Sequence, residues 1–407
     1  MISKEERVFR SNLVALGIDN VGSGLFLPTG LIYLTRSMGL PLGLAAAVLA
    51  AGTGVGLVMP ALAARRIDAW GPGRVVAISQ LVQAAGMGAY LLGVGGGLPF
   101  AVFGAVLTAG GAQLFYSALG KMTKDMAAGG SKDEAFASVE MVRSAAFGVG
   151  GLAAGALLTL PSEWLSLGVA VNAVSFVAAS AILARAASRG PAASPGSASA
   201  RQEFPERTAP LAVLRDVRFL VLAGTTFSVF LSVDLFLVLM PVFAESAAAV
   251  PGWTVGACVA LSTVLGSTAG RWVVRVTSGL TRTGCFVLGA AAMLVWAALM
   301  AATLVLPVVG RPAVMLMATV FLSAGSRIAG PRLFAVLGEI APSEAQGAYF
   351  AYMQYAFTAA QLCAPLLAAL LALGPGVPWL IDALILATVF FTSRWLARSL
   401  PEAALRH

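Results

Sequence analysis

The sequence predicts an all-α integral membrane protein with twelve transmembrane helices in two related six-helix halves. Of its 407 residues, 59% are hydrophobic and only 11% are charged, whereas a soluble domain carries roughly 25% charged residues. Apolar runs of the length that crosses a bilayer, about 20 residues, follow one another along the chain. The net charge of +8 arises from Lys and Arg residues between these runs. This composition argues strongly against a soluble enzyme.

The first apolar run, residues 13–33, follows basic residues in the manner of a signal peptide. It lacks a small-residue cleavage site and contains Asp19 and Asn20, so we predict an uncleaved first span. Five more runs complete the first half, at 44–63, 75–94, 100–119, 136–160 and 164–184.

A segment rich in Pro, Ala, Ser and Gly separates the two halves, which favours a flexible linker. The sequence thus predicts bundles over 1–184 and 218–407 joined by a linker over 185–217. The second half contains runs at 219–240, 253–273, 283–308, 313–337, 347–373 and 379–396.

The positive charges predict the orientation. Of 26 Lys and Arg residues, only Arg36 and Arg311 fall in expected outer loops, and Arg143 and Arg327 fall well inside spans. The others lie near the face that holds both termini and the linker, which the positive-inside rule makes cytoplasmic. Arginine greatly outnumbers lysine, which is typical of a GC-rich bacterial genome. We therefore expect a bacterial inner membrane protein.

The halves share landmarks at one constant separation of 208 residues, which indicates a duplicated six-span unit. The pairs are Arg10 and Arg218, Arg74 and Arg282, and Pro99 and Pro307.

The loop between the second and third spans resembles a motif of the major facilitator superfamily, G-x-x-x-D-R-x-G-R-[RK]. Asp68, Gly71 and Arg74 match it, while Ala64 and Ala69 replace its first Gly and its first Arg. An Asp and an Arg around a Gly-Pro turn can form a charge-assisted latch. The alternative is an ordinary positive-inside loop. The resemblance implies the major facilitator fold and a gating role for these three residues.

The start of the fifth span, from Arg143 to Gly150, is similar to that of bacterial drug/proton antiporters, although the Pro of the antiporter signature is absent. The resemblance implies proton-coupled export of a small amphipathic compound by alternating access. An importer or symporter of a small metabolite is the alternative, and a non-transporting sensor or membrane enzyme is a third.

Ionisable side chains within spans require a reason, since each costs at least ~2.5–3.5 kcal/mol. At 1.5 Å per residue, Asp19 and Arg143 lie about 9 and 10 Å into their spans, and Asp234 about 22 Å. We predict that Asp19 carries the coupled proton, with Arg143 or Arg327 as its partner. A static ion pair is the alternative. We expect Asp234 to contact the substrate, and Asp382 to lie where water reaches it in a structural role.

Uncharged polar residues within the spans predict a cavity, because the resemblance places most of them on the lining helices. Interhelical hydrogen bonds are the alternative, at ~0.6 kcal/mol each. The predicted substrate-binding residues are Asn20, Gln113, Tyr116, Ser232, Asp234, Gln354, Tyr355 and Gln361. Ser228 and Thr358 belong to the same polar set.

The sequence shows no motif for enzymatic, metal-binding or ATP-binding chemistry. The single histidine is the last residue, the three cysteines show no C-x-x-C spacing, and no G-x-x-x-x-G-K-[ST] segment occurs. We therefore expect neither enzymatic activity, cofactor, metal nor nucleic acid. The expected partners are a small-molecule substrate, protons and the lipid bilayer, and we expect a monomer.

Overall fold

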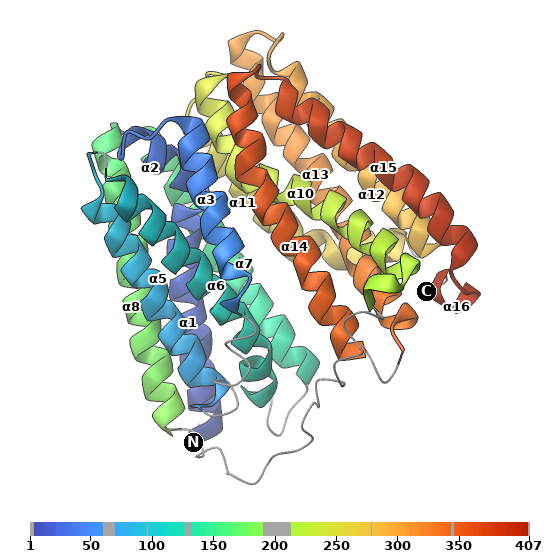
Figure 1. The fold of residues 1–407 in the computed structure, drawn as a ribbon, viewed down its shortest axis with the longest axis horizontal. Coiled ribbons are helices and arrows are strands. Elements are labelled where there is room, and N and C mark those ends of the chain that lie inside the picture. The colour runs from blue at the N-terminus through green and yellow to red at the C-terminus, as the bar shows by residue number, and fades with distance from the viewer. Residues whose placement is uncertain are drawn as a thin grey trace. The chain divides into compact units, whose positions relative to one another are not determined.

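The computed structural model describes residues 4–59, 70–95, 97–126, 132–189, 213–277, 279–342 and 346–405 (Figure 1). Within these ranges the chain is helical and forms twelve helices of at least 15 residues. They are α1 (Lys4–Phe26), α3 (Leu42–Gly56), α5 (Pro72–Leu92), α6 (Leu98–Met126), α7 (Lys132–Leu157), α8 (Leu165–Arg189), α10 (Val217–Ser246), α11 (Trp253–Val276), α12 (Arg282–Ala302), α13 (Arg311–Ile340), α14 (Gln346–Ala369) and α15 (Val377–Ser399). The shorter helices are α2 (Gly30–Arg36) and α16 (Glu402–Leu405).

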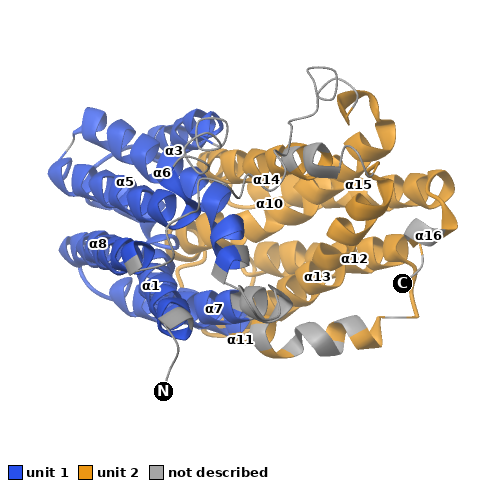
Figure 2. Cartoon of the chain, turned by 90° about the horizontal axis from the view of Figure 1, so that it is seen from below, with its two compact units in different colours: residues 1–197, 251–263 blue, residues 198–250, 264–407 orange. Residues whose placement is uncertain are grey.

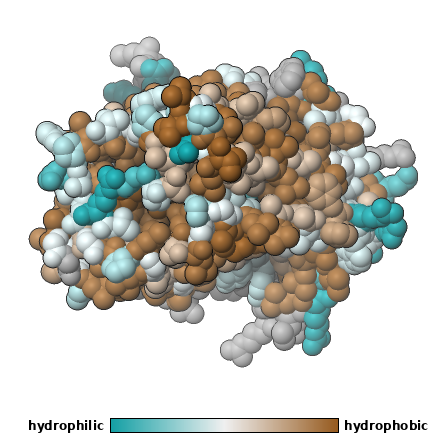
Figure 3. Space-filling model, turned by 90° about the horizontal axis from the view of Figure 1, so that it is seen from above, coloured by the Kyte–Doolittle hydropathy of each residue, from teal (hydrophilic) through white to brown (hydrophobic). Residues whose placement is uncertain are grey.

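Each expected span overlaps one of the twelve long helices, so the all-α prediction is confirmed. Eight of the described helices are long and apolar enough to cross a membrane, and three further apolar stretches are shorter. Figure 3 shows hydrophobic residues over much of the face in view.

The first span differs from the prediction, because it is divided into α1 and α2. Residues 27–29 form a turn between them. Pro28 lies in this turn, and a proline has no backbone N–H with which to continue a helix.

Contacts between Cα atoms divide the chain into two compact units (Figure 2). Unit 1 comprises Met1–Ser197 and Pro251–Thr263, and unit 2 comprises Ala198–Val250 and Val264–His407.

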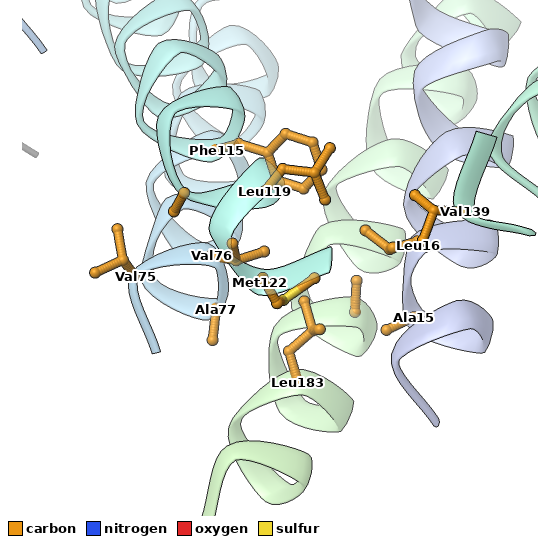
Figure 4. Packing of buried hydrophobic residues seen from close by; sticks show 12 residues of the cluster. Ala15, Leu16, Val75, Val76, Ala77, Phe115, Leu119, Met122, Val139 and Leu183 are labelled. Carbon is orange, nitrogen blue, oxygen red and sulfur yellow. The ribbon is translucent and has the colours of Figure 1, made fainter. Parts of the chain in front are cut away.

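The core of unit 1 is built from α1, α5, α6, α7 and α8 (Figure 4). Its side chains are aliphatic except for one phenylalanine and one methionine, and all are buried. They are Ala15, Leu16, Val75, Val76, Ala77, Phe115, Ala118, Leu119, Met122, Val139, Ala179 and Leu183.

Glycines bring α1 and α7 into close contact in unit 1. A Cβ atom on Gly24 would collide with the carbonyl of Phe147, and one on Gly150 would collide with the carbonyl of Val21. Such close approach of two backbones requires small residues. It also places the polar turn of α1, which carries Asp19, beside α7.

In unit 2 the first turn of α10 is tied to α14. Asp216 caps α10, since its Oδ1 accepts a 2.9 Å hydrogen bond from the backbone N–H of Arg218. Its Oδ2 accepts a 2.8 Å bond from the hydroxyl of Tyr349 on α14. The Tyr349 ring also contacts Phe219, with centroids 5.3 Å apart.

Candidate functional site

The candidate site in unit 1 is centred on Asp19 of α1, whose side chain is 5% exposed. Its carboxyl accepts hydrogen bonds from Ser23 Oγ at 3.4 Å and Asn20 Nδ2 at 3.3 Å. Both distances exceed the usual upper values, about 3.0 Å for a hydroxyl donor and about 3.2 Å for an amide donor. The neighbours on α1 therefore solvate this buried carboxyl only weakly.

Arg143 of α7 provides the opposite charge and interacts electrostatically with Asp19. Its guanidinium also contacts α6, where it donates a 3.2 Å hydrogen bond to the hydroxyl of Tyr116. It lies 5.6 Å from the ring centroid of Phe115 and 5.4 Å from that of Tyr116. These distances are within the range of cation–π attraction. Arg143 thus has two sets of partners, a carboxyl on α1 and an aromatic pair on α6.

Gln80 of α5 completes the cluster, and the sequence analysis missed it. Its side chain is 0% exposed, and its amide interacts with Asp19. Within the described part of the chain, neither Gln80 Nε2 nor Oε1 reaches hydrogen-bond geometry with any partner. A glutamine inside the apolar run 75–94 was the available signal. The structure therefore joins α1, α5, α6 and α7 around one carboxyl.

The other predicted residues of unit 1 differ in their surroundings. Asn20 is buried, and its Nδ2 donates a 2.8 Å bond to the carbonyl of Leu16 in its own helix. Gln113 is buried where α6 meets α3, and its Cγ lies 3.2 Å from the position of a Cβ on Gly56. Tyr116 is 53% exposed and is the one with a direct contact to Arg143.

Asp234 of α10 is the candidate substrate contact in unit 2. Its side chain is half-buried, and no described residue pairs with its carboxyl by hydrogen bond or opposite charge. Phe230, four residues earlier, shares its helix face. The Phe230 ring meets Phe357 of α14 edge-on at 4.4 Å, and Phe357 stacks on Phe334 of α13 at 5.6 Å. An unpaired carboxyl and aromatic rings therefore occupy adjacent turns.

Ser232 and Asp382 face each other at another side of α10. The Ser232 hydroxyl is fully buried and donates a 2.9 Å hydrogen bond to Asp382 Oδ1 on α15. Asp382 is 0% exposed. The expectation that water reaches Asp382 is therefore wrong, because α15 packs against α10 and Ser232 of α10 contacts the carboxyl directly.

The polar residues of α14 are divided between exposed and buried positions. Gln354, Tyr355 and Gln361 are exposed, whereas Thr358 is buried and donates to the carbonyl of Gln354 at 3.1 Å.

Arg327 of α13 lies against Gly266 of α11, where a Cβ on the glycine would collide with the Arg327 guanidinium. Of the two candidate arginines, Arg143 is the one that shares a unit with Asp19.

The predicted gating loop is described in part. Asp68 lies outside the described residues. Gly71 precedes α5 with a φ of +82°, a conformation that glycine adopts far more readily than other residues. Pro72 then occupies the first position of α5, and Arg74 is exposed in the first turn.

Comparisons with known proteins define the family. A sequence profile of the Major Facilitator Superfamily matches residues 13–306. The chain belongs to this superfamily. It is therefore a multi-pass membrane transporter, in agreement with its twelve long helices. No curated protein matches the sequence significantly.

Solved structures share the fold. A variant of the nucleoside transporter NupG superposes with a TM-score of 0.74 at 14% identity, covering 96% of this chain and 99% of that one. A variant of the peptide transporter POT gives 0.74 at 14% identity, covering 97% and 94%. Tetrameric PepTSo2 gives 0.69 at 15% identity, covering 98% of each. At such identities the likeness establishes the fold alone.

Proposed function

We propose that the protein is a proton-coupled secondary transporter of a small amphipathic compound, with Asp19 as the proton-binding carboxyl. The observation that carries this proposal is the cluster in unit 1, where a buried carboxyl faces an arginine with alternative partners. The proposal places the protein in a bacterial inner membrane, as a monomer with both termini in the cytoplasm.

The coupling step follows from the two sets of Arg143 partners. When Asp19 is ionised, it attracts the Arg143 guanidinium. A proton that binds Asp19 removes this attraction, and Arg143 is then held by the Tyr116 hydroxyl and the two rings of α6. Protonation thus changes the force between α1 and α7 without leaving an isolated buried charge, which would be costly. In alternating access, the rocking of the two halves would be coupled to this change in the attraction between α1 and α7.

Asp234 serves in this proposal as the substrate contact. Its carboxyl has no described protein partner, so a cationic group on a substrate would satisfy it, and the neighbouring phenylalanines would contact an apolar portion. Tyr355, Gln354 and Gln361 provide exposed polar groups on α14 of the same unit. Ser232 is not retained as a substrate contact, because its hydroxyl is bound to Asp382.

The leading direction of transport is export in exchange for protons, as the resemblance of the fifth span implies. A second candidate is proton-coupled import of a small metabolite. The absent Pro in the fifth span favours it, and the fold is shared with a nucleoside transporter and peptide transporters.

Proteoliposomes with an imposed pH gradient test both candidates. We would use ethidium as an amphipathic cation and uridine as a nucleoside, each with the interior made more acidic or more alkaline than the exterior. Proton exchange should concentrate ethidium in acidic vesicles, whereas symport should concentrate uridine in alkaline ones. Equal uptake of both probes with and without a pH gradient would contradict proton coupling.

A further inference from the structure

A second buried carboxyl, Asp382, lies apart from the Asp19 cluster and has no role in the proposed mechanism. Ser232 Oγ donates to its Oδ1 at 2.9 Å. Its Oδ2 is buried and has no hydrogen-bond partner among the described residues. An ionised carboxylate can accept about four hydrogen bonds. A single donor is therefore the environment of a neutral acid rather than of an anion.

Among the described residues, no opposite charge acts on Asp382. The Ser232 hydroxyl is the one side chain that interacts with it electrostatically in the described part of the chain. The helices packed against α15 do carry ionisable residues. On α10 these are Arg218 in the first turn, Asp234, which is two residues from Ser232 and so points to a different side of the helix, and Glu245 in the last turn; none of the three acts on the Asp382 carboxyl. On α12, Arg282 and Cys285 lie in the first turn, far along the helix from Trp296, which meets α15 at Trp379.

A cluster of aromatic rings lies one turn from Asp382. Trp379, one turn earlier on α15, meets Trp296 of α12 and Phe243 of α10 edge-on, at 5.3 and 5.0 Å between centroids. The indole Nε1 atoms of Trp379 and Trp296 are buried and make no hydrogen bond within the described residues. Neither indole N–H therefore stabilises a negative charge on Asp382.

The first half of the chain has an uncharged counterpart of this arrangement. Asn172 of α8 is 1% exposed. Its Oδ1 lies 2.5 Å from the position of a Cβ on Gly22 of α1, and its Nδ2 donates to Met87 Sδ of α5 at 3.7 Å. Because α8, α1 and α5 are the sixth, first and third long helices, they correspond to α15, α10 and α12 in the duplicated unit. The helix of the first half that corresponds to α15 therefore buries an amide, and a protonated acid has nearly the same shape as an amide and is likewise uncharged.

We infer that Asp382 is a proton-binding site, a carboxylic acid that carries its proton in the described conformation and exchanges it with water when the contact between α10 and α15 opens. On opening, the Asp382 O–H bond breaks, the proton passes to water, and water molecules take the place of the Ser232 hydroxyl as hydrogen-bond donors to the carboxylate. On closing, a proton from water binds again before the carboxyl is buried. This site does not depend on the role of Asp19.

Infrared difference spectroscopy of the full-length protein in lipid vesicles tests the assignment without any substrate. The spectrum of the wild type minus that of Asp382→Asn should contain the C=O band of a protonated carboxylic acid at neutral pH. Ser232→Ala should move this band to higher frequency, because the carboxyl loses its one donor. Asn172→Ala, which removes a buried amide on the corresponding helix of the first half, is the control and should leave the band unchanged.

Exchange is tested on the same samples. The band should shift when H₂O is replaced by D₂O, and it should disappear as the pH is raised. Absence of the band at neutral pH would overturn the inference, since Asp382 would then be ionised. A band that responds to neither D₂O nor alkaline pH would also overturn it, since the acid would then be static. If Asp382→Asn does not reach the membrane, a C=O band that shifts in Ser232→Ala assigns the protonated acid to Asp382 instead. If no band shifts in Ser232→Ala, the inference is contradicted.

Discussion

Replacing Asp19 with Asn should abolish pH-driven accumulation while leaving exchange down a concentration gradient intact. The substitution keeps the shape of the side chain, so Ser23 and Asn20 retain a neighbour of the same size. It removes the one group in the cluster that can bind a proton and attract Arg143. Substrate exchange that requires no net proton movement should therefore continue.

The expected size of the accumulation follows from one proton moved per substrate, because the cluster contains one carboxyl that can bind a proton. One proton moving down a gradient of one pH unit provides ~1.4 kcal/mol, which corresponds to about a tenfold concentration ratio. With the membrane potential held at zero by valinomycin and equal K⁺, coupling to Asp19 should contribute about tenfold accumulation of ethidium per pH unit. Asp19→Asn should remove this factor.

The assay measures retained ethidium in proteoliposomes with the interior one pH unit more acidic, at matched protein content. Counterflow of labelled against unlabelled ethidium, without a gradient, controls for folding and insertion. If Asp19→Asn still concentrates ethidium as steeply with pH as the wild type, Asp19 is a structural residue. The static ion-pair alternative would then hold.

Four further outcomes follow from contacts or motifs described above. Tyr116→Phe removes the 3.2 Å bond to Arg143 but keeps the ring, so pH-driven uptake should slow several-fold, which corresponds to about 1 kcal/mol. Tyr116→Ala should slow uptake further, and equal rates for the two variants would exclude a role for the ring. Asp234→Asn should reduce ethidium transport about tenfold, ~1.4 kcal/mol, with no effect on an uncharged substrate; an unchanged substrate profile would contradict the contact. Asp68→Asn should slow transport at an unchanged level in the membrane, and normal flux would remove the latch. Tyr349→Phe should lower the thermal midpoint, because it removes a hydrogen bond to a carboxylate, about 1.5–3 kcal/mol; an unchanged midpoint in a thermal-shift assay would show that the bond contributes nothing.

The helices were predictable from the sequence because bilayer thickness fixes the length of an apolar run. The partners of each polar residue were not, because hydropathy does not reveal which helix a side chain faces. Ser232 and Asp234 illustrate this limit. They are close in sequence and both polar, but two residues of a helix point about 200° apart, so one meets Asp382 and the other lies on the face of Phe230.

Depth along a helix was a poor guide to solvation for the same reason. Asp382 lies in the second turn of α15, near enough to a helix end to suggest contact with water. Its burial is lateral, since α15 packs against α10 and α12 and the Ser232 hydroxyl of α10 contacts the carboxyl. Gln80 was missed because a glutamine in an apolar run becomes informative only when α5 is known to lie beside the cluster that contains Asp19.

The three buried or half-buried aspartates differ in what surrounds the carboxyl, and the different roles that we propose for them follow from this difference. Asp19 has a cation nearby, so both of its protonation states have a partner, which suits repeated proton binding during transport. Asp234 has no described partner, so its charge is available to a substrate. Asp382 has one hydroxyl donor and a cluster of aromatic rings one turn away, which favour the neutral acid. A transporter that used one carboxyl for all three tasks would have substrate and proton compete for it, whereas separate environments let each bind without displacing the other.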